Sequence, residues 1–128
     1  MRADFPLELQ THTVGPAGER AVYAVEVPAD LLYFEGHFPG APLLPGVAQL
    51  AVLVLAQVHR LWPYLGEPSR VSRLKFKRPI GPGDRLLLSL ELSRAAVPRV
   101  DFSLERAGDC CTTGAMTFAT ASPPQTRA

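Results

Sequence analysis

The sequence has 128 residues, 47% of them hydrophobic, and a formal net charge of +1 at pH 7. This length and hydrophobic fraction predict one globular domain with its own core and exclude a chain that stays disordered. The near-zero charge gives no general reason to expect a nucleic acid or an anionic membrane as partner.

The N-terminal residues lack the apolar stretch of a secretory signal, so we expect a cytoplasmic protein. Cys110 and Cys111 are adjacent, cannot easily bridge each other, and are too few for a zinc site. We interpret both as small strand residues. No metal or redox cofactor is expected, because the sequence holds no ligand cluster and no dinucleotide-binding glycine motif.

Alternation of apolar and polar residues predicts two strands at the start of the chain. The first runs over residues 7–13, and the second carries Tyr23, Val25 and Val27 on one face. A Pro-Ala-Asp break at residues 28–30 then leads into a long loop over residues 31–45.

The run over residues 47–61 is apolar on nearly every face, and its length and boundaries predict a helix. Pro45 suits the first helical turn, and Pro63 disfavours helical geometry at the residue before it. Gln49 and Gln57 interrupt the run, which is too short for a bilayer span of about twenty residues. A helix that is hydrophobic all round must be covered, so we expect a sheet to enclose it.

Four strands with clean alternation follow the helix. In the first, Leu74 and Phe76 oppose Arg73, Lys75 and Lys77. The apolar faces of the other three are formed by Leu86, Leu88, Leu90 and Leu92, by Val100, Phe102 and Leu104, and by Met116 and Phe118.

Two strands, one helix and four strands predict an α+β chain in which an antiparallel sheet curls around one long central helix, the hotdog fold. We expect this domain over residues 1–120 and a disordered tail over residues 121–128, which are rich in proline and small polar residues. The helix has more apolar surface than one sheet can bury, so two copies are expected to associate.

Residues 33–47, Tyr-Phe-Glu-Gly-His-Phe-Pro-Gly-Ala-Pro-Leu-Leu-Pro-Gly-Val, resemble the active-site motif of hotdog-fold 3-hydroxyacyl-acyl carrier protein dehydratases of the FabA/FabZ type. Residues 75–84 resemble that family's strand and turn after the helix, and the likeness extends over residues 7–119. Residues 43–50 look closest to the dehydratase-like proteins of aryl polyene and related pigment pathways. The resemblance implies removal of water from a 3-hydroxyacyl thioester to give the trans-2-enoyl thioester, in fatty acid, aryl polyene or polyketide-like biosynthesis.

This reaction needs a base for the α-proton, a donor for the thioester oxygen, and an acid for the leaving hydroxyl. His37 is the natural base, because a neutral imidazole accepts a proton near pH 7; a loop histidine bonded to a backbone carbonyl is the alternative. Leu44 stands directly before Pro45, where a Ser, Thr, Asp or Asn would cap the helix. The N–H groups from Gly46 onward therefore lack a side-chain partner and can bind a substrate oxygen. The resemblance implies that the Gly46 N–H polarises the thioester carbonyl. The acyl chain is assigned to a tunnel lined by Phe38, Leu43, Val47, Ala51 and Leu55.

The family's second catalytic residue is an Asp or Glu on the helix, and its position falls at Ala51. The helical neighbours Val47, Ala48 and Leu55 are also apolar, so no carboxylate one turn away replaces it. Gln49 is not an acid, and we expect it to satisfy a buried backbone group instead.

Several accounts of the missing acid stay open. His37 could act as both base and acid. The chain could be a catalytically impaired subunit that forms a heterodimer with an acid-bearing paralogue, because the family builds each site from two subunits. The fold could also serve an acyl thioesterase, or a carrier-protein-binding module that needs no His37 chemistry.

The residues Arg70, Arg73, Lys75, Lys77 and Arg78 cluster around the strand after the helix. Acyl carrier proteins are acidic, so the cluster predicts electrostatic docking of a carrier-protein thioester that weakens as salt rises. A solvated outer strand face is the alternative. We expect no nucleic acid partner and no membrane insertion.

Overall fold

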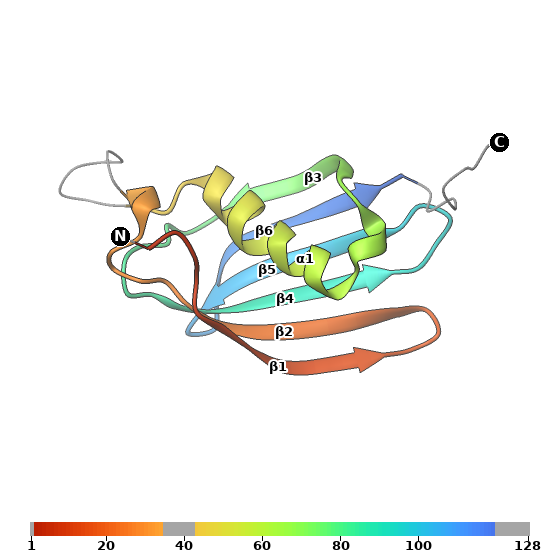
Figure 1. Ribbon diagram of the computed structural model, residues 1–128, viewed down its shortest axis with the longest axis horizontal. Helices are drawn as coiled ribbons and strands as arrows, with labels where there is room; N and C mark the ends of the chain where they lie inside the picture. The colour runs from red at the N-terminus through yellow and green to blue at the C-terminus, as the bar shows by residue number, and fades with distance from the viewer. Residues whose placement is uncertain (1, 35–42, 120–128) are drawn as a thin grey trace.

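A computed structural model of the chain describes residues 2–34 and 43–119. Six strands form one antiparallel sheet in the order β1-β2-β4-β5-β6-β3, with a helix lying across one face (Figure 1). The strands are β1 (Leu7–Val14), β2 (Gly18–Glu26), β3 (Pro68–Phe76), β4 (Arg85–Ser93), β5 (Arg99–Arg106) and β6 (Asp109–Phe118). The predicted order of two strands, one helix and four strands, and with it the hotdog fold, is confirmed. The predicted tail at 121–128 lies outside the described residues.

The helix extends over residues 46–61, as the two flanking prolines predict. Its middle, η2 (Ala48–Val54), is π-helical, and its last part, α1 (Leu55–Leu61), is α-helical. At the end of η2 the Leu55 N–H donates to the Leu50 carbonyl five residues earlier. Short 3-10 turns, η1 (Leu32–Phe34) and η3 (Pro63–Leu65), flank the helix in the chain. The sequence did not predict the π turns, because a pattern that is apolar on every face does not reveal its winding.

The core lies between the helix and the strands β4, β5 and β6. Leu53, Val54 and Val58 of the helix are fully buried. The strand residues predicted to face them are buried as well: Leu86, Leu88, Leu90, Leu92, Val100, Phe102, Leu104, Met116 and Phe118. The alternation of the sequence therefore identified the core faces of these strands correctly.

The sheet does not enclose the helix completely. Val47 is 78% exposed, Ala51 is exposed and Leu55 is half-buried. These three residues form an outward stripe on the helix, which the sheet leaves uncovered. The sheet covers the opposite side of the helix, where Leu53, Val54 and Val58 are buried. The apolar surface of the stripe is what the sequence predicted one sheet would fail to bury, and association of two copies stays a prediction.

Strand β3 lies at one edge of the sheet and contains a bulge at Arg73. Arg73 has φ of 54°, and the pairing of β3 with β6 shifts register between Ser72 and Lys75. A positive φ is uncommon for a residue with a side chain and marks the inserted residue of a bulge here. Beyond the bulge, Leu74 packs against the core and Phe76 lies beside the start of the helix, so both face the helix as predicted.

Candidate active site

The start of the helix is tied to the turn after β3 and to β6. The Leu44 N–H donates to the Ile80 carbonyl at 2.7 Å, and the Lys77 N–H donates to the Cys111 carbonyl at 2.7 Å. These backbone bonds place the residues before the helix against the segment that leaves β3.

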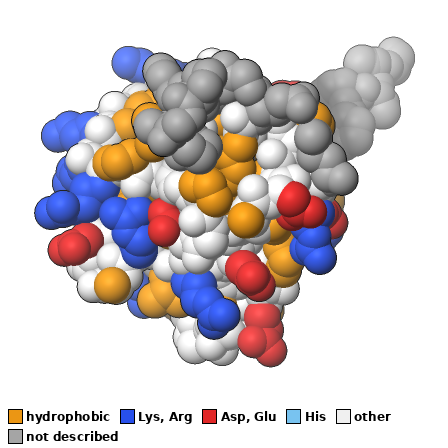
Figure 2. Space-filling view, turned by 90° about the vertical axis from the view of Figure 1, so that its left-hand side faces the viewer, with side chains coloured by type: hydrophobic (Ala, Val, Ile, Leu, Met, Phe, Trp, Pro, Cys, Tyr) orange, Lys and Arg blue, Asp and Glu red, His pale blue; other side chains and the backbone are white. Residues whose placement is uncertain are grey.

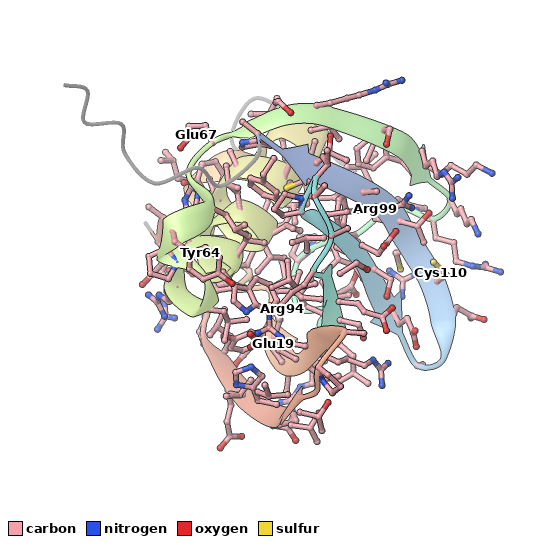
Figure 3. All side chains as sticks on the ribbon, turned by 90° about the vertical axis from the view of Figure 1, so that its right-hand side faces the viewer. Glu19, Tyr64, Glu67, Arg94, Arg99 and Cys110 are labelled. Carbon is pink, nitrogen blue, oxygen red and sulfur yellow. The ribbon has the colours of Figure 1, made fainter. Side chains whose placement is uncertain are left out.

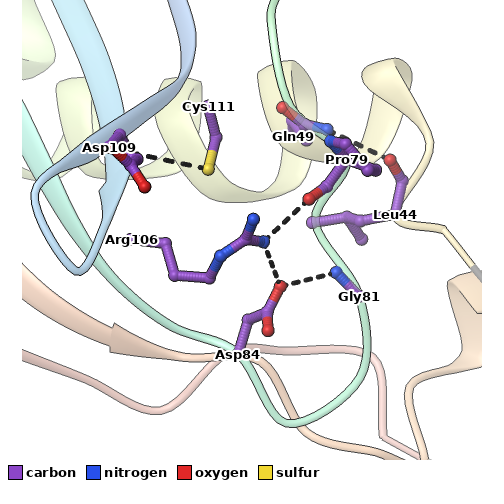
Figure 4. A network of polar contacts seen from close by, with 8 residues as sticks. All are labelled: Leu44, Gln49, Pro79, Gly81, Asp84, Arg106, Asp109 and Cys111. Atoms are coloured by element: carbon purple, nitrogen blue, oxygen red, sulfur yellow. Dashed lines mark hydrogen bonds and ion pairs between the residues drawn. The ribbon is translucent and has the colours of Figure 1, made fainter.

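Gln49 is buried inside this junction and is 4% exposed. Its side-chain N–H donates to the Leu44 carbonyl at 3.1 Å, a bond drawn in Figure 4. Its Oε1 accepts from the Thr112 hydroxyl on β6 at 2.7 Å. The prediction that Gln49 satisfies a buried backbone group is confirmed. The Thr112 partner was missed, because nothing in a sequence links two residues that are 63 positions apart.

Asp84 and Arg106 fix the turn after β3 (Figure 4). Asp84 Oδ2 accepts from the Gly81 N–H and from Arg106 Nη1, both at 2.8 Å. Arg106 Nη1 also donates to the Pro79 carbonyl at 2.8 Å. The hydrogen bond to Asp84, together with its charge, raises the pKa of the Arg106 guanidinium. Arg106, at the end of β5, therefore bonds to both ends of this turn.

A pocket of about 310 Å³ opens between the helix start and this turn. It is lined by Leu43, Leu44, Gly46, Gln49, Phe76, Lys77, Arg78 and Pro79. Phe76 is 51% exposed, and its phenyl ring covers Gly46. A Cβ on Gly46 would lie 2.8 Å from Phe76 Cζ, which is closer than real Cβ contacts, so the ring would have to move for any other residue. No side chain of residues 2–34 or 43–119 forms a capping hydrogen bond at Val47, directly before η2 begins.

The structure brings together part of the predicted site. Leu43 and Gly46 line the pocket, together with Lys77 and Arg78 of the predicted docking cluster. Within the described part of the chain, no Asp or Glu lines it.

Three other predicted residues lie elsewhere. Val47, Ala51 and Leu55 belong to the outward stripe and do not line this pocket among the described residues, so the acyl tunnel that they are assigned to stays a prediction. His37 and Phe38 lie outside the described residues. Their roles, like those of the other predicted site residues, stay predictions.

The basic cluster is exposed along β3 and the turn after it. Its members are Arg70, Arg73, Lys75, Lys77 and Arg78, all exposed. None of them pairs with a carboxylate in residues 2–34 or 43–119. Figure 2 shows the end of the molecule where the helix begins, with Lys and Arg side chains grouped beside apolar ones.

A second polar cluster surrounds Glu19 near the far end of the helix (Figure 3). Glu19 accepts from His12 Nε2 at 2.8 Å and pairs with Arg94. The nearby Trp62 indole N–H lowers the pKa of the Glu19 carboxyl most, followed by His12 and Arg94, while burial opposes them. The side chain of His59, on α1, bonds the Gly66 carbonyl at 2.7 Å. His12 and His59 are strand and helix-surface residues, as predicted.

Residues 13–115 match a family described as ApeI-like, ApeI dehydratase. The chain belongs to the ApeI-like dehydratase family. It is also 31% identical over 114 residues to the 3-hydroxyacyl-acyl-carrier-protein dehydratase FabZ of Alkaliphilus metalliredigens. The matched region covers 83% of this chain and 78% of the relative.

Two solved structures share the fold of this chain, and one of them is described as a dehydratase complex. The dehydratase heterocomplex ApeI:P from Xenorhabdus doucetiae is 26% identical, with a TM-score of 0.67 over 93% of this chain and 99% of that one. An uncharacterized protein from Erwinia carotovora subsp. atroseptica is 25% identical, with a TM-score of 0.70 over 93% of this chain and 95% of that one. The dehydratase function predicted from the sequence is confirmed at the level of this family.

Two further observations concern the described residues of this ApeI-like dehydratase. Among them, no three His, Cys, Asp or Glu side chains gather as a metal ion would require. None of the helices there is long and apolar enough to cross a membrane. A cytoplasmic location stays a prediction.

Proposed function

We propose that this chain dehydrates 3-hydroxyacyl thioesters of acyl carrier protein as one subunit of a heterodimer whose other subunit supplies the acid. His37 takes the α-proton, and the Gly46 N–H binds the thioester oxygen as negative charge develops on it. The acid of the partner protonates the leaving hydroxyl, so that water and the trans-2-enoyl thioester are released. The chain thus supplies the base and the N–H donor, and the partner supplies the acid.

The observation that carries this proposal is the position of Ala51. It lies on the outward stripe of the helix, exposed between Val47 and Leu55. The pocket at Gly46 has no carboxylate in its lining. A general acid therefore has to come from outside the described part of this chain. A second subunit that covers the stripe would also bury apolar surface that one sheet leaves in water.

The comparisons support a heterodimer over a homodimer. The ApeI:P structure is described as a dehydratase heterocomplex, and this chain resembles the matched chain over nearly its whole length. In a homodimer of this chain, both sites would contain Ala51 and both would lack the helix acid.

The basic cluster supports acyl carrier protein as the carrier of the substrate. Lys77 and Arg78 are exposed cations that line the pocket at Gly46. A negatively charged carrier that docks on this cluster would present its thioester arm to that pocket.

The test is to place an acid at position 51 and measure dehydration of a 3-hydroxyacyl carrier-protein thioester by the purified chain. Ala51→Glu should raise turnover at least about 100-fold, because general acid catalysis contributes about 10²- to 10⁴-fold. Since Ala51 is exposed, the longer side chain meets no core residue. Ala51→Gln is the matched control, of equal size but without an acidic proton, and should give no gain.

His37→Ala in the Ala51→Glu background should abolish the gain. A parent chain that turns over as fast as the Ala51→Glu variant would refute the partner-supplied acid and leave His37 as both base and acid. Equal activity of the Glu and Gln variants would also refute it.

A further inference from the structure

Two buried polar side chains from distant parts of the chain meet at the start of the helix. Gln49 is 4% exposed and Thr112 is 1% exposed, and the Thr112 hydroxyl donates to Gln49 Oε1 at 2.7 Å. A polar group is unfavourable in a core unless it is hydrogen-bonded, so the two side chains depend on each other. An apolar pair of the same size would fill this space without that requirement.

Burial alone does not explain this bond, as the second buried glutamine of the helix shows. Gln57 is also 4% exposed, yet its Oε1 has no hydrogen-bond partner among the described residues. Gln57 lies about two turns further along and does not line the pocket at Gly46. The glutamine whose amide nitrogen and oxygen are both hydrogen-bonded is the one beside the pocket.

The side-chain amide of Gln49 bonds to Leu44, which lies two residues before the helix begins at Gly46. Leu44 has its carbonyl bonded to the Gln49 amide at 3.1 Å and its N–H bonded to Ile80 at 2.7 Å. Both polar groups of its backbone are therefore fixed. Pro45 follows with a restricted φ, so the direction of the Gly46 N–H is set by how Leu44 is held.

Thr112 links this arrangement to the opposite wall of the pocket. In the pairing of β3 with β6, Thr112 lies across from Phe76. The Phe76 ring is the group that covers Gly46. The hydrogen bond from Thr112 to Gln49 therefore joins the β3–β6 pair, which carries Phe76, to the start of the helix, which carries Gly46.

We infer that Gln49 and Thr112 are positioning residues, which hold the Gly46 N–H in the direction that the thioester oxygen requires. The inference rests on the proposed role of Gly46 in dehydration. Donors that stabilise a developing oxyanion must be preorganised, and a misplacement of about 1 Å can cost about 100-fold in rate. Losing the bond should therefore lower kcat and leave KM nearly unchanged, since the Gly46 N–H matters most when negative charge develops on the thioester oxygen.

The experiment compares four variants in the form of the protein that is active, either with its partner or with Ala51→Glu. Gln49→Leu and Thr112→Val remove the bond at nearly constant size and should lower kcat at least about tenfold, with KM changed less than about twofold. Thr112→Ser keeps the hydroxyl and should restore kcat to within about twofold of the parent. Gln57→Leu is the matched control and should leave kcat unchanged.

Thermal unfolding of each variant separates this effect from a loss of folded protein. If Gln49→Leu does not fold, the Thr112→Val and Thr112→Ser pair still decides. An unchanged kcat in Thr112→Val would overturn the inference, and so would a failure of Thr112→Ser to restore it or an equal loss in Gln57→Leu.

A second measurement does not require turnover. The amide signal of Gly46 in ¹⁵N-labelled protein should shift when a short 2-enoyl pantetheine thioester is added, shift less in Thr112→Val, and recover in Thr112→Ser. If these shifts are observed in a protein that shows no turnover, they would support the positioning role of Gln49 and Thr112, although the proposed function would fail. An equal shift in Thr112→Val, or a Gly46 signal that ignores the thioester in a protein that turns over, would overturn the inference and leave the dehydratase function standing.

Discussion

The contact between Gly46 and Phe76 makes a quantitative prediction about stability. A methyl group at position 46 would lie 2.8 Å from Phe76 Cζ, so the ring has to leave. Phe76 is 51% exposed, so its packing contributes roughly half of the 1.5–3 kcal/mol of a buried phenylalanine, about 1 kcal/mol. Replacing glycine by alanine in a helix contributes up to about 1 kcal/mol in the opposite direction. Gly46→Ala should therefore change the free energy of unfolding by close to zero.

The Phe76→Ala variant measures the packing free energy that the ring loses in Gly46→Ala. In the parent it should lose about 1 kcal/mol, roughly 4 °C in Tm, whereas in the Gly46→Ala background it should lose almost nothing, because the ring is already displaced. Urea unfolding of the four proteins, at one protein concentration because association adds to stability, gives the coupling energy directly. Additive effects within about 0.3 kcal/mol would show that Phe76 does not occupy the space above Gly46 and would refute the reasoning.

Two further predictions concern charged groups. The pKa of the Glu19 carboxyl is lowered from 4.5, so the stability that Glu19 contributes is present above pH 4.5 and is lost as the pH falls below that value. The difference in urea midpoint between the parent and Glu19→Gln should therefore shrink from about pH 6 to about pH 3.5. A difference that stays constant would contradict this prediction. Lys77→Glu with Arg78→Glu should weaken carrier-protein binding at least about tenfold at low salt and flatten its salt dependence, whereas Arg20→Glu, on β2, should not. Parent binding that is equal at low and high salt would contradict electrostatic docking.

The elements that the sequence predicted best are those in which geometry follows directly from residue order. In β4 and β5 every second residue is apolar, and a pleated strand puts such residues on one face whatever surrounds it. The ends of the helix followed from Pro45 and Pro63, because each proline restricts its own backbone or that of the residue before it. These signals are local, and local signals are readable from one sequence.

The features that were missed depend on contacts between distant residues. The bulge at Arg73 exists only relative to the pairing with β6, and the bond from Thr112 to Gln49 joins residues 63 positions apart. The uncovered stripe was predicted only as an excess of apolar surface, because an all-apolar helix does not say which side meets the sheet. Of the site, the sequence identified Gly46 and Leu43 in the pocket but not the ring of Phe76 above it.

The exposure of Ala51 has a consequence for how such proteins diverge. Ala51 is exposed in this chain, so exchanging it for a carboxylate leaves the chain's own core unchanged, and in the proposed heterodimer this one substitution distinguishes the subunit without the acid from the subunit that supplies it. After a gene duplication, either copy can lose the acid without losing its fold. The copy that loses it then depends on the copy that keeps it, and selection can preserve the pair as a unit.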